Sequence, residues 1–252
     1  MKKIQNTAAS ALAATLLAGS GAVLAADAAD AEKSPWKASA ELGYVMTSGN
    51  SETSTTNAKF DATHEKEQWR HNVHAEAFGA STTDQVTDVE TTSAERYQLS
   101  GKSDYKFSEF NYAFGLLNYD KDRFSGYEYQ STIAAGYGRR VIHQDDMTLD
   151  LEIGPGLRIV KLDNAPDSDS EGILRLAGKF LWKVSDTSTF TEDLYVDAGS
   201  DLTVSKSVTA LTAKVNTSLA MKLSLTVKSN SVVPAGKEKT DTETAVTLVY
   251  SF

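Results

Sequence analysis

The sequence predicts an all-β fold, a transmembrane antiparallel up-and-down β-barrel of about 12 strands. Apolar and polar side chains alternate with a period of two from Trp36 to Phe252, and a helical period appears nowhere for long. The chain contains 9 Phe, 10 Tyr and 3 Trp, residues that suit pleated strands. It contains no cysteine, which excludes disulfide bonds, thiolate metal sites and cysteine nucleophiles. Packing and backbone pairing must therefore stabilise the fold.

Twelve segments carry the alternation and define the expected strands. The first five are residues 36–47, 54–64, 69–80, 92–105 and 111–120. The sixth, residues 127–141, shows the pattern most clearly. In it Tyr129, Ile133 and Tyr137 share one parity, while polar residues such as Gln130 share the other. One face of this strand is therefore apolar and the other polar.

The last six segments repeat this two-faced pattern. They are residues 147–160, 173–184, 190–198, 207–217, 220–231 and 240–252. In the eleventh segment Met221, Leu223 and Leu225 alternate with Lys222 and Ser224. Inside the seventh, Pro155 is flanked by two glycines, which indicates a bulge or kink where no backbone donor is required.

The connections between the segments also alternate in character. Those after odd-numbered segments are expected to be longer, as in 81–91 and 162–171, and those after even-numbered segments are tight, as in 65–68 and 143–146. Outer-membrane barrels have an even strand number, short periplasmic turns and longer external loops. Closure also removes edge strands and pairs every backbone group inside the lipid.

A soluble β-sandwich is the main alternative, because its strands alternate as well. The tryptophans favour the barrel, since each falls at the turn side of a strand, as in an interfacial aromatic belt. The belt is predicted to contain Trp36, Trp69, Trp182, Tyr250 and Phe252. The aromatic C-terminal residue on an alternating last strand also resembles the signal read by the machinery that inserts outer-membrane barrels.

The N-terminus has the features of an export signal. Lys2 and Lys3 precede an apolar stretch of small residues that ends in a cleavage pattern near Ala25. A buried N-terminal helix is the alternative, but the stretch has no polar face. The expected organisation is a signal peptide at 1–25, a flexible leader at 26–35 and an outer-membrane barrel at 36–252, exported through the periplasm to the cell outer membrane.

Composition excludes other classes of protein. The chain has 34 acidic and 25 basic residues, so it lacks the basic footprint that nucleic-acid binding requires. Beyond the N-terminus no apolar run approaches the roughly 18 residues of a spanning helix. No phosphate-binding loop, dinucleotide fingerprint or hydrolase elbow occurs.

The histidines do not indicate a metal site or a catalytic site. His71 and His74 have a spacing that binds zinc on a helix, but residues three apart on a strand face opposite sides. The expectation is therefore no metal, no cofactor and no enzymatic activity.

Several short motifs resemble those of a known family. They are Ser39–Tyr44, Thr47–Ser51, Arg123–Tyr127, Gly136–Gly138, Thr240–Thr244 and Tyr250–Phe252. Over residues 36–252 the chain is similar to the salt-induced outer-membrane proteins, a domain-of-unknown-function family of bacterial barrels. The resemblance implies an outer-membrane barrel with expression linked to salt, and it implies no reaction, ligand or catalytic residue.

The polar face of the strands carries the only candidate functional residues. The predicted lumen-lining set is Arg70, Glu76, Arg96, Lys102, Glu128, Arg140, Glu152, Arg158, Lys179 and Lys228. Charges on the lipid side would each cost about 2–4 kcal/mol at mid-membrane, which explains the segregation without any function. Small residues are expected to leave lumen space at Gly115, Ala134, Gly136, Gly154 and Gly156.

Two functional hypotheses follow from this lumen. The first is a narrow channel for ions or small polar solutes, because about eight strands already give an interior that side chains can fill and twelve give a wider one. The second is a closed structural or interaction barrel whose acidic loops, 84–90 and 163–171, bind cations, lipopolysaccharide or a protein. Both make outer-membrane lipids and the insertion machinery partners, and neither involves nucleic acid.

Overall fold

The computed structural model describes residues 34–47, 52–84, 89–163 and 165–252. The predicted signal peptide and nearly all of the predicted leader lie outside these residues. Residues Pro35–Phe252 form one compact unit. No helix that could cross a membrane occurs in this described part of the chain.

Twelve strands make up the described unit. They are β1 (Trp36–Thr47), β2 (Glu52–Glu65), β3 (Trp69–Asp84), β4 (Val89–Lys106), β5 (Asn111–Asp122), β6 (Tyr127–His143), β7 (Met147–Leu162), β8 (Asp169–Lys183), β9 (Ser188–Gly199), β10 (Thr203–Lys214), β11 (Leu219–Asn230) and β12 (Thr240–Ser251). Each overlaps one predicted segment. The expected long connections are shorter than predicted, because β3, β4 and β8 extend into them.

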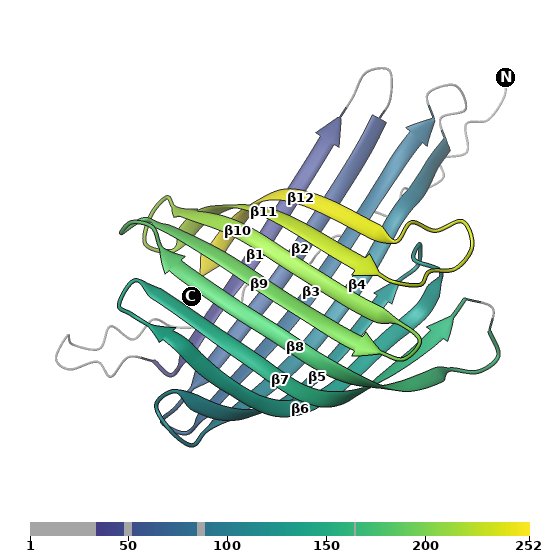
Figure 1. The fold of residues 1–252 in the computed structure, drawn as a ribbon. Coiled ribbons are helices and arrows are strands. Elements are labelled where there is room, and N and C mark those ends of the chain that lie inside the picture. The colour runs from purple at the N-terminus through teal and green to yellow at the C-terminus, as the bar shows by residue number, and fades with distance from the viewer. Residues whose placement is uncertain (1–33, 48–51, 85–88, 164) are drawn as a thin grey trace, which may run out of the picture. The chain divides into compact units, whose positions relative to one another are not determined.

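The strands form a closed antiparallel barrel in which each pairs with its neighbours in sequence and β12 pairs with β1. This confirms the predicted all-β up-and-down barrel. In Figure 1, the purple and blue strands β1 to β4 form the far wall, and β7 to β12 cross in front of them at a steep angle. We call the end that holds Trp36 and Phe252 the base, and the opposite end, which holds the loop 231–239, the rim.

The outer surface of the barrel is apolar along alternate positions. On β11, Met221, Leu223 and Leu225 are all exposed, whereas the intervening Ser224 is buried inside. Because successive side chains on a strand point to opposite faces, this exposure assigns one parity to the outside and the other to the lumen. The same alternation runs along β5 and β6, where buried and exposed residues follow one another.

Aromatic side chains surround both ends of this apolar band. All five predicted belt residues are exposed near the base, where the Trp69 ring lies 5.0 Å from that of Tyr105 and the Tyr250 ring lies 5.9 Å from that of Phe252. A second group, which the sequence analysis missed, lies nearer the rim and includes Tyr119 and Tyr129, whose rings are 6.0 Å apart. Two such girdles are typical of outer-membrane barrels.

One carboxylate on the outer face departs from the apolar pattern. Glu192 of β9 lies beside Thr209 of β10. Its two carboxylate oxygens accept hydrogen bonds from Ser207 Oγ at 2.6 Å and Thr209 Oγ1 at 2.5 Å. Neighbouring hydroxyl groups therefore satisfy this acid on the wall itself.

The pairing of β6 with β7 is interrupted beside Pro155, but the register does not shift there, so the predicted bulge is absent at this proline. Residue pairs in register stop at Ala134 with Gly156 and resume at Tyr137 with Ile153. Proline has no backbone N–H to donate to the ladder, so a gap of this kind costs little at this position.

Candidate functional site in the lumen

Most residues of the predicted lumen set lie inside the barrel. The inward-facing members are Arg70, Glu76, Arg96, Lys102, Arg140, Glu152, Arg158, Lys179 and Lys228, and their side chains take part in ion pairs. The exception is Glu128, which stands half-exposed near the rim and pairs with Lys161 at 2.8 Å. A β-bulge between Tyr127 and Tyr129 shifts the register there, so simple parity fails.

A network of charges lies against one wall near the base. We call it the basal network, and it consists of Arg70, Lys102, Asp104, Tyr112, Arg140, Asp150 and Glu152. Arg70 Nε donates to Asp104 Oδ2 at 2.7 Å, and Arg140 bonds Asp150 through Nε at 2.6 Å and Nη2 at 2.9 Å. Both pairs join adjacent strands. Asp104 is fully buried, so its pairing supports the wall more than it obstructs the lumen.

An aromatic floor supports this basal network. Tyr112, Phe114 and Ala134 form a buried apolar cluster on β5 and β6. The Lys102 ammonium lies 5.4 Å from the Tyr112 ring centre, and the Arg70 guanidinium lies 5.2 Å from the same ring. These distances suit cation–π contacts, which fix both cations against the wall. Lys102 and Tyr112 Oη both donate to Glu152.

The space beside the basal network is a cavity of about 700 Å³, which we call the vestibule. Six basic residues line it: Lys37, Arg70, Lys102, Arg175, Lys179 and Lys222. Five acidic residues line it as well: Glu41, Asp61, Asp150, Glu152 and Asp193. Lys179 and Asp193 are loosely paired at 3.4 Å and largely exposed, which keeps this part of the wall hydrated.

Above the vestibule, side chains from opposite walls meet. Lys206 Nζ of β10 donates to Gln98 Oε1 of β4 at 2.9 Å, and Lys228 Nζ of β11 donates to Asp120 Oδ2 of β5 at 3.1 Å. Each pair joins strands that are six positions apart in the ring of twelve. These bonds therefore span the full width of the lumen.

Arg96 completes this cross-wall layer. Its Nη2 donates to Glu76 Oε1 and to Glu243 Oε2, both at 2.7 Å, so β4 is tied to β3 and to β12. We define the cross-wall layer as Glu76, Arg96, Gln98, Asp120, Lys206, Lys228 and Glu243. Its members are all polar, so the layer that divides the lumen is held by hydrogen bonds and charge rather than by apolar packing.

A second cavity, of about 520 Å³, opens toward the rim, and we call it the cleft. Five acidic residues line it: Glu95, Asp120, Asp122, Asp241 and Glu243. Only three basic residues, Arg96, Lys206 and Lys228, do so. The cleft is therefore more acidic than the vestibule.

The loop 231–239 reaches across the rim. Lys237 Nζ donates to the Phe124 carbonyl at 2.6 Å, and Tyr127 Oη donates to the Val232 carbonyl at 3.4 Å. Nearby, the guanidinium of Arg158 is almost fully buried and donates to the carbonyls of Asp197 and Leu202 at 2.7 and 2.6 Å. These contacts narrow the rim on the side of β6 to β10.

The glycines act differently from the expectation. Gly115 lies on the outer face, where a Cβ would meet nothing within 4 Å. A Cβ on Gly136 would lie 2.2 Å from the Ile153 carbonyl oxygen, and one on Gly154 would lie 2.2 Å from that of Ala135. The inward face predicted for Gly115 was wrong, whereas Gly136 and Gly154 have the inward parity that was predicted, and their missing side chains allow the backbones of β6 and β7 to approach each other.

The two histidines of β3 face opposite sides, as the strand geometry requires. His71 stacks on the outer face against Trp69 with ring centres 5.5 Å apart. His74 lies inside, with Nδ1 2.8 Å from Asp61 Oδ1. Within the described ranges no group of three or more metal-ligating side chains converges.

Several lumen residues escaped the sequence analysis. The largest omissions are Glu41, Lys59, Asp104, Asp120, Arg175, Asp197, Lys206, Lys222 and Glu243, all of which make polar contacts inside. Each has the inward parity of its strand, so parity could have found them. Parity could not identify the residues with which they pair.

Comparison with known proteins gives a family and a fold. Residues 40–252 match the model of a family described as "Protein of unknown function, DUF481". The uncharacterized protein YdiY of Escherichia coli (strain K12) is 30% identical over 227 residues, which cover 89% of this chain and 86% of that protein.

Solved barrels resemble the chain in fold alone. The NanC porin is 10% identical, with a TM-score of 0.51 over 84% of this chain and 98% of that one. The translocator domain of the autotransporter NalP from Neisseria meningitidis is 10% identical, with a TM-score of 0.49 over 86% of this chain and 88% of that one.

Proposed function

Since the chain belongs to the family of proteins of unknown function DUF481, whose description supplies no activity, we propose a function from its lumen: a narrow outer-membrane pore for ions or small polar solutes, closed by the cross-wall layer. The observation that carries the proposal is the presence of two charged cavities, the vestibule and the cleft, separated by a polar layer. An apolar partition would resist water, whereas a polar one can exchange its bonds for water.

The proposed setting is the bacterial outer membrane, reached by export after cleavage near Ala25. The apolar outer face and its two aromatic girdles support this setting. In this orientation the base faces the periplasm and the rim faces the exterior. The membrane lipids contact the apolar band, and the insertion machinery is a transient partner. The proposal includes no catalysis and no cofactor.

The proposed pore prefers cations. At the rim the cleft carries five acidic against three basic residues, whereas the vestibule carries five acidic against six basic ones. A mouth of net negative charge concentrates cations and repels anions. The effect falls at high ionic strength because salt screens the exposed charges.

Ionic current across a planar bilayer tests the pore. The double variant Lys206→Ala/Lys228→Ala removes both links between diametrically opposite strands and should raise the single-channel conductance several-fold. The matched control, Lys37→Ala/Lys179→Ala, removes two lysines of the vestibule that make no cross-wall bond, and its conductance should stay near that of the unmodified protein. Equal conductance in all three proteins would reject the layer as the barrier.

The second candidate is the closed structural or interaction barrel. The observation in its favour is the same cross-wall layer, reinforced by the loop 231–239 over the rim. Of its acidic loops, Glu171 turns inward to Arg158 at 2.9 Å, which leaves fewer acids for an external partner. If the double variant folds and carries no current at any salt concentration, this second function is favoured.

The proposal also includes a link between salt and the level at which the protein is expressed. It rests on the family resemblance, and no lumen residue encodes it. Transcript levels after an osmotic shift would measure it independently of conductance.

A further inference from the structure

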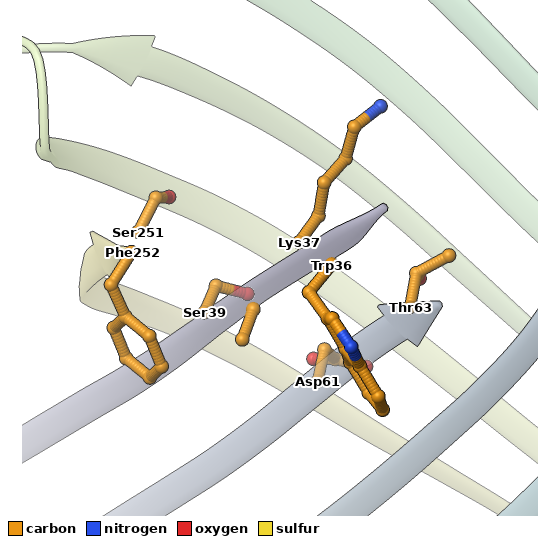
Figure 2. A pocket seen from close by; sticks show the side chains of 8 residues that line it. Trp36, Lys37, Ser39, Asp61, Thr63, Ser251 and Phe252 are labelled. Carbon is orange, nitrogen blue, oxygen red and sulfur yellow. The ribbon is translucent and has the colours of Figure 1, made fainter. Parts of the chain in front are cut away.

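The seam between β1 and β12 is unlike every other seam of the barrel. Only four residue pairs are in register across it, from Ser39 with Ser251 to Leu42 with Leu248, whereas each other pair of neighbouring strands has at least eleven. The pairing is confined to the base, where the Phe252 N–H donates to the Ala38 carbonyl at 3.0 Å. Figure 2 shows Ser251 and Phe252 beside Ser39 at this closed end.

Toward the rim the two strands diverge. No residue pair joins 43–47 of β1 to 240–247 of β12, although these residues pair normally with β2 and β11 on their other sides. The backbone ladder that closes the barrel is therefore absent along the rim half of this seam.

Side chains bridge the seam from the lumen side, both at the end of the backbone ladder and beyond it. Glu41 of β1 accepts hydrogen bonds from Lys222 at 2.8 Å and from Thr247 at 3.3 Å. Glu243 of β12 accepts one from Asn57 of β2 at 3.1 Å, across β1. These two clasps are side-chain contacts, which open at a lower cost than a strand ladder that must break many bonds together.

The two faces of the seam have opposite polarity. Leu42, Val246 and Leu248 line it on the outside and are half-exposed or more. Glu41 and Glu243 line it on the inside, and the latter also lines the cleft together with Thr242 and Thr244, whose parity is outward. The cleft is therefore lined by β12 residues of both parities. A molecule with a polar head and one alkyl chain matches this change of polarity.

We propose that the β1–β12 seam is a lateral portal for a single-chain amphiphile, whose head occupies the cleft while its alkyl chain passes between the strands into the bilayer. This inference rests on the proposed membrane position of the barrel, and it is independent of current along the barrel axis. Polar groups of the cleft hold the head, and the alkyl chain contacts Leu42, Val246 and Leu248 on the outer side of the seam. Opening requires the Asn57–Glu243 clasp to separate.

Photocrosslinking with an alkyne-tagged hexadecylphosphocholine tests the portal. p-Benzoylphenylalanine replaces Thr55, which lines the cleft, or Ala177, which lines the vestibule on the far side of the barrel. A second cleft position, Thr226, covers the case in which the Thr55 variant does not fold. Capture from the cleft should exceed capture from the vestibule several-fold, and a butyl analogue of the probe should give no such excess.

A reversible disulfide across the seam distinguishes entry of the probe through the seam from entry through the rim. A Cβ on Gly43 would lie 3.0 Å from Thr247 Cγ2, so Gly43→Cys with Thr247→Cys places a disulfide one step beyond the natural ladder. The chain contains no other cysteine. Oxidation should reduce cleft capture to the vestibule level, and reduction should restore it. Asn57→Ala, which removes the upper clasp, should increase capture.

The outcomes are distinct. Equal cleft capture in the oxidised and reduced proteins would overturn the portal, because the probe would then enter through the rim. Absence of any excess over Ala177 would overturn it as well. The conductance of the locked protein should equal that of the reduced protein, so failure of the portal and failure of the pore are read by different measurements.

Discussion

The basal network and the cross-wall layer use the same kinds of residue with opposite consequences. Near the base, Arg70 pairs with Asp104 on the adjacent strand and Lys102 pairs with Glu152 three strands away, and a cavity of about 700 Å³ lies beside them. Higher in the lumen, Lys206 with Gln98 and Lys228 with Asp120 join opposite walls and divide the space. The position of the partner around the ring, and not the presence of charge, decides whether a charged lumen is open.

The basal network and the cross-wall layer are also expected to affect different properties, the first stability and the second permeability. Asp104 is completely buried beside two cations, so its pairing belongs to the wall. The lysines of the cross-wall layer instead reach partners on the opposite wall, so their loss removes the links across the lumen. Basal substitutions are therefore expected to change the free energy of unfolding, and cross-wall substitutions to change conductance.

The largest stability effect is expected for Asp104→Asn. The substitution removes the fully buried carboxylate that Arg70 and Lys102 share and leaves Arg70 only Asp150 at 3.6 Å, so the free energy of unfolding should fall by about 3–5 kcal/mol. The matched substitution Asp193→Asn, at a half-exposed vestibule carboxylate, should cost at most about 1 kcal/mol. Urea unfolding of the refolded barrel in detergent measures both, and similar losses would remove the distinction between wall and lumen charges.

A smaller effect is expected where an aromatic ring covers a glycine. A Cβ on Gly138 would lie 2.3 Å from the Tyr112 ring, so Gly138→Ala should cost about 1–3 kcal/mol by overpacking the aromatic floor. On the outer face, a Cβ on Gly101 meets nothing within 4 Å, so Gly101→Ala should be nearly neutral. The same unfolding curves report both variants. A neutral Gly138→Ala would show that the floor can shift.

A change of ion preference is expected at the rim. Asp122→Asn/Asp241→Asn removes two acids from the cleft and should reduce the preference for cations, because the mouth loses net negative charge. Reversal potentials under a salt gradient measure the change, and Glu128→Gln outside the lumen is the control. An unchanged reversal potential in the double variant would place the selective region elsewhere.

The smallest effect is expected at the rim ion pair. Lys161→Ala breaks its pairing with Glu128, a contact between partly exposed side chains. Exposed pairs of this kind add little stability because water and salt screen them, so the unfolding midpoint should barely move. A loss comparable with that of Asp104→Asn would mean that exposure is a poor guide to the energetics of this barrel.

Period-two alternation was sufficient to predict the strands and most of the lumen face. Lys228 and Arg96 follow from parity alone, because a strand has only two faces. Glu128 failed because a single bulged residue reverses the parity locally. For Gly136 and Gly154 parity gave the correct face but not the close approach of the neighbouring backbone, and only Gly115 was assigned to the wrong face.

The partners across the lumen could not be predicted from the sequence. Lys228 meets Asp120, 108 residues earlier, only because closure of the ring brings β11 opposite β5. The short β1–β12 ladder was equally hidden, since both strands alternate normally and only the closed barrel shows how few of their residues pair. Local patterns determine faces, whereas the closed geometry determines which faces meet.

Directional thiol modification tests most directly whether the cross-wall layer divides the lumen. Single cysteines replace Thr55 in the cleft and Ala177 in the vestibule, and a membrane-impermeant thiol reagent is added to one side of a bilayer. With the layer intact, the first should react only from the rim side and the second only from the base side. In Lys206→Ala/Lys228→Ala, each should react from both sides. Reaction of the Ala177→Cys protein from the rim side with the layer intact would contradict the account.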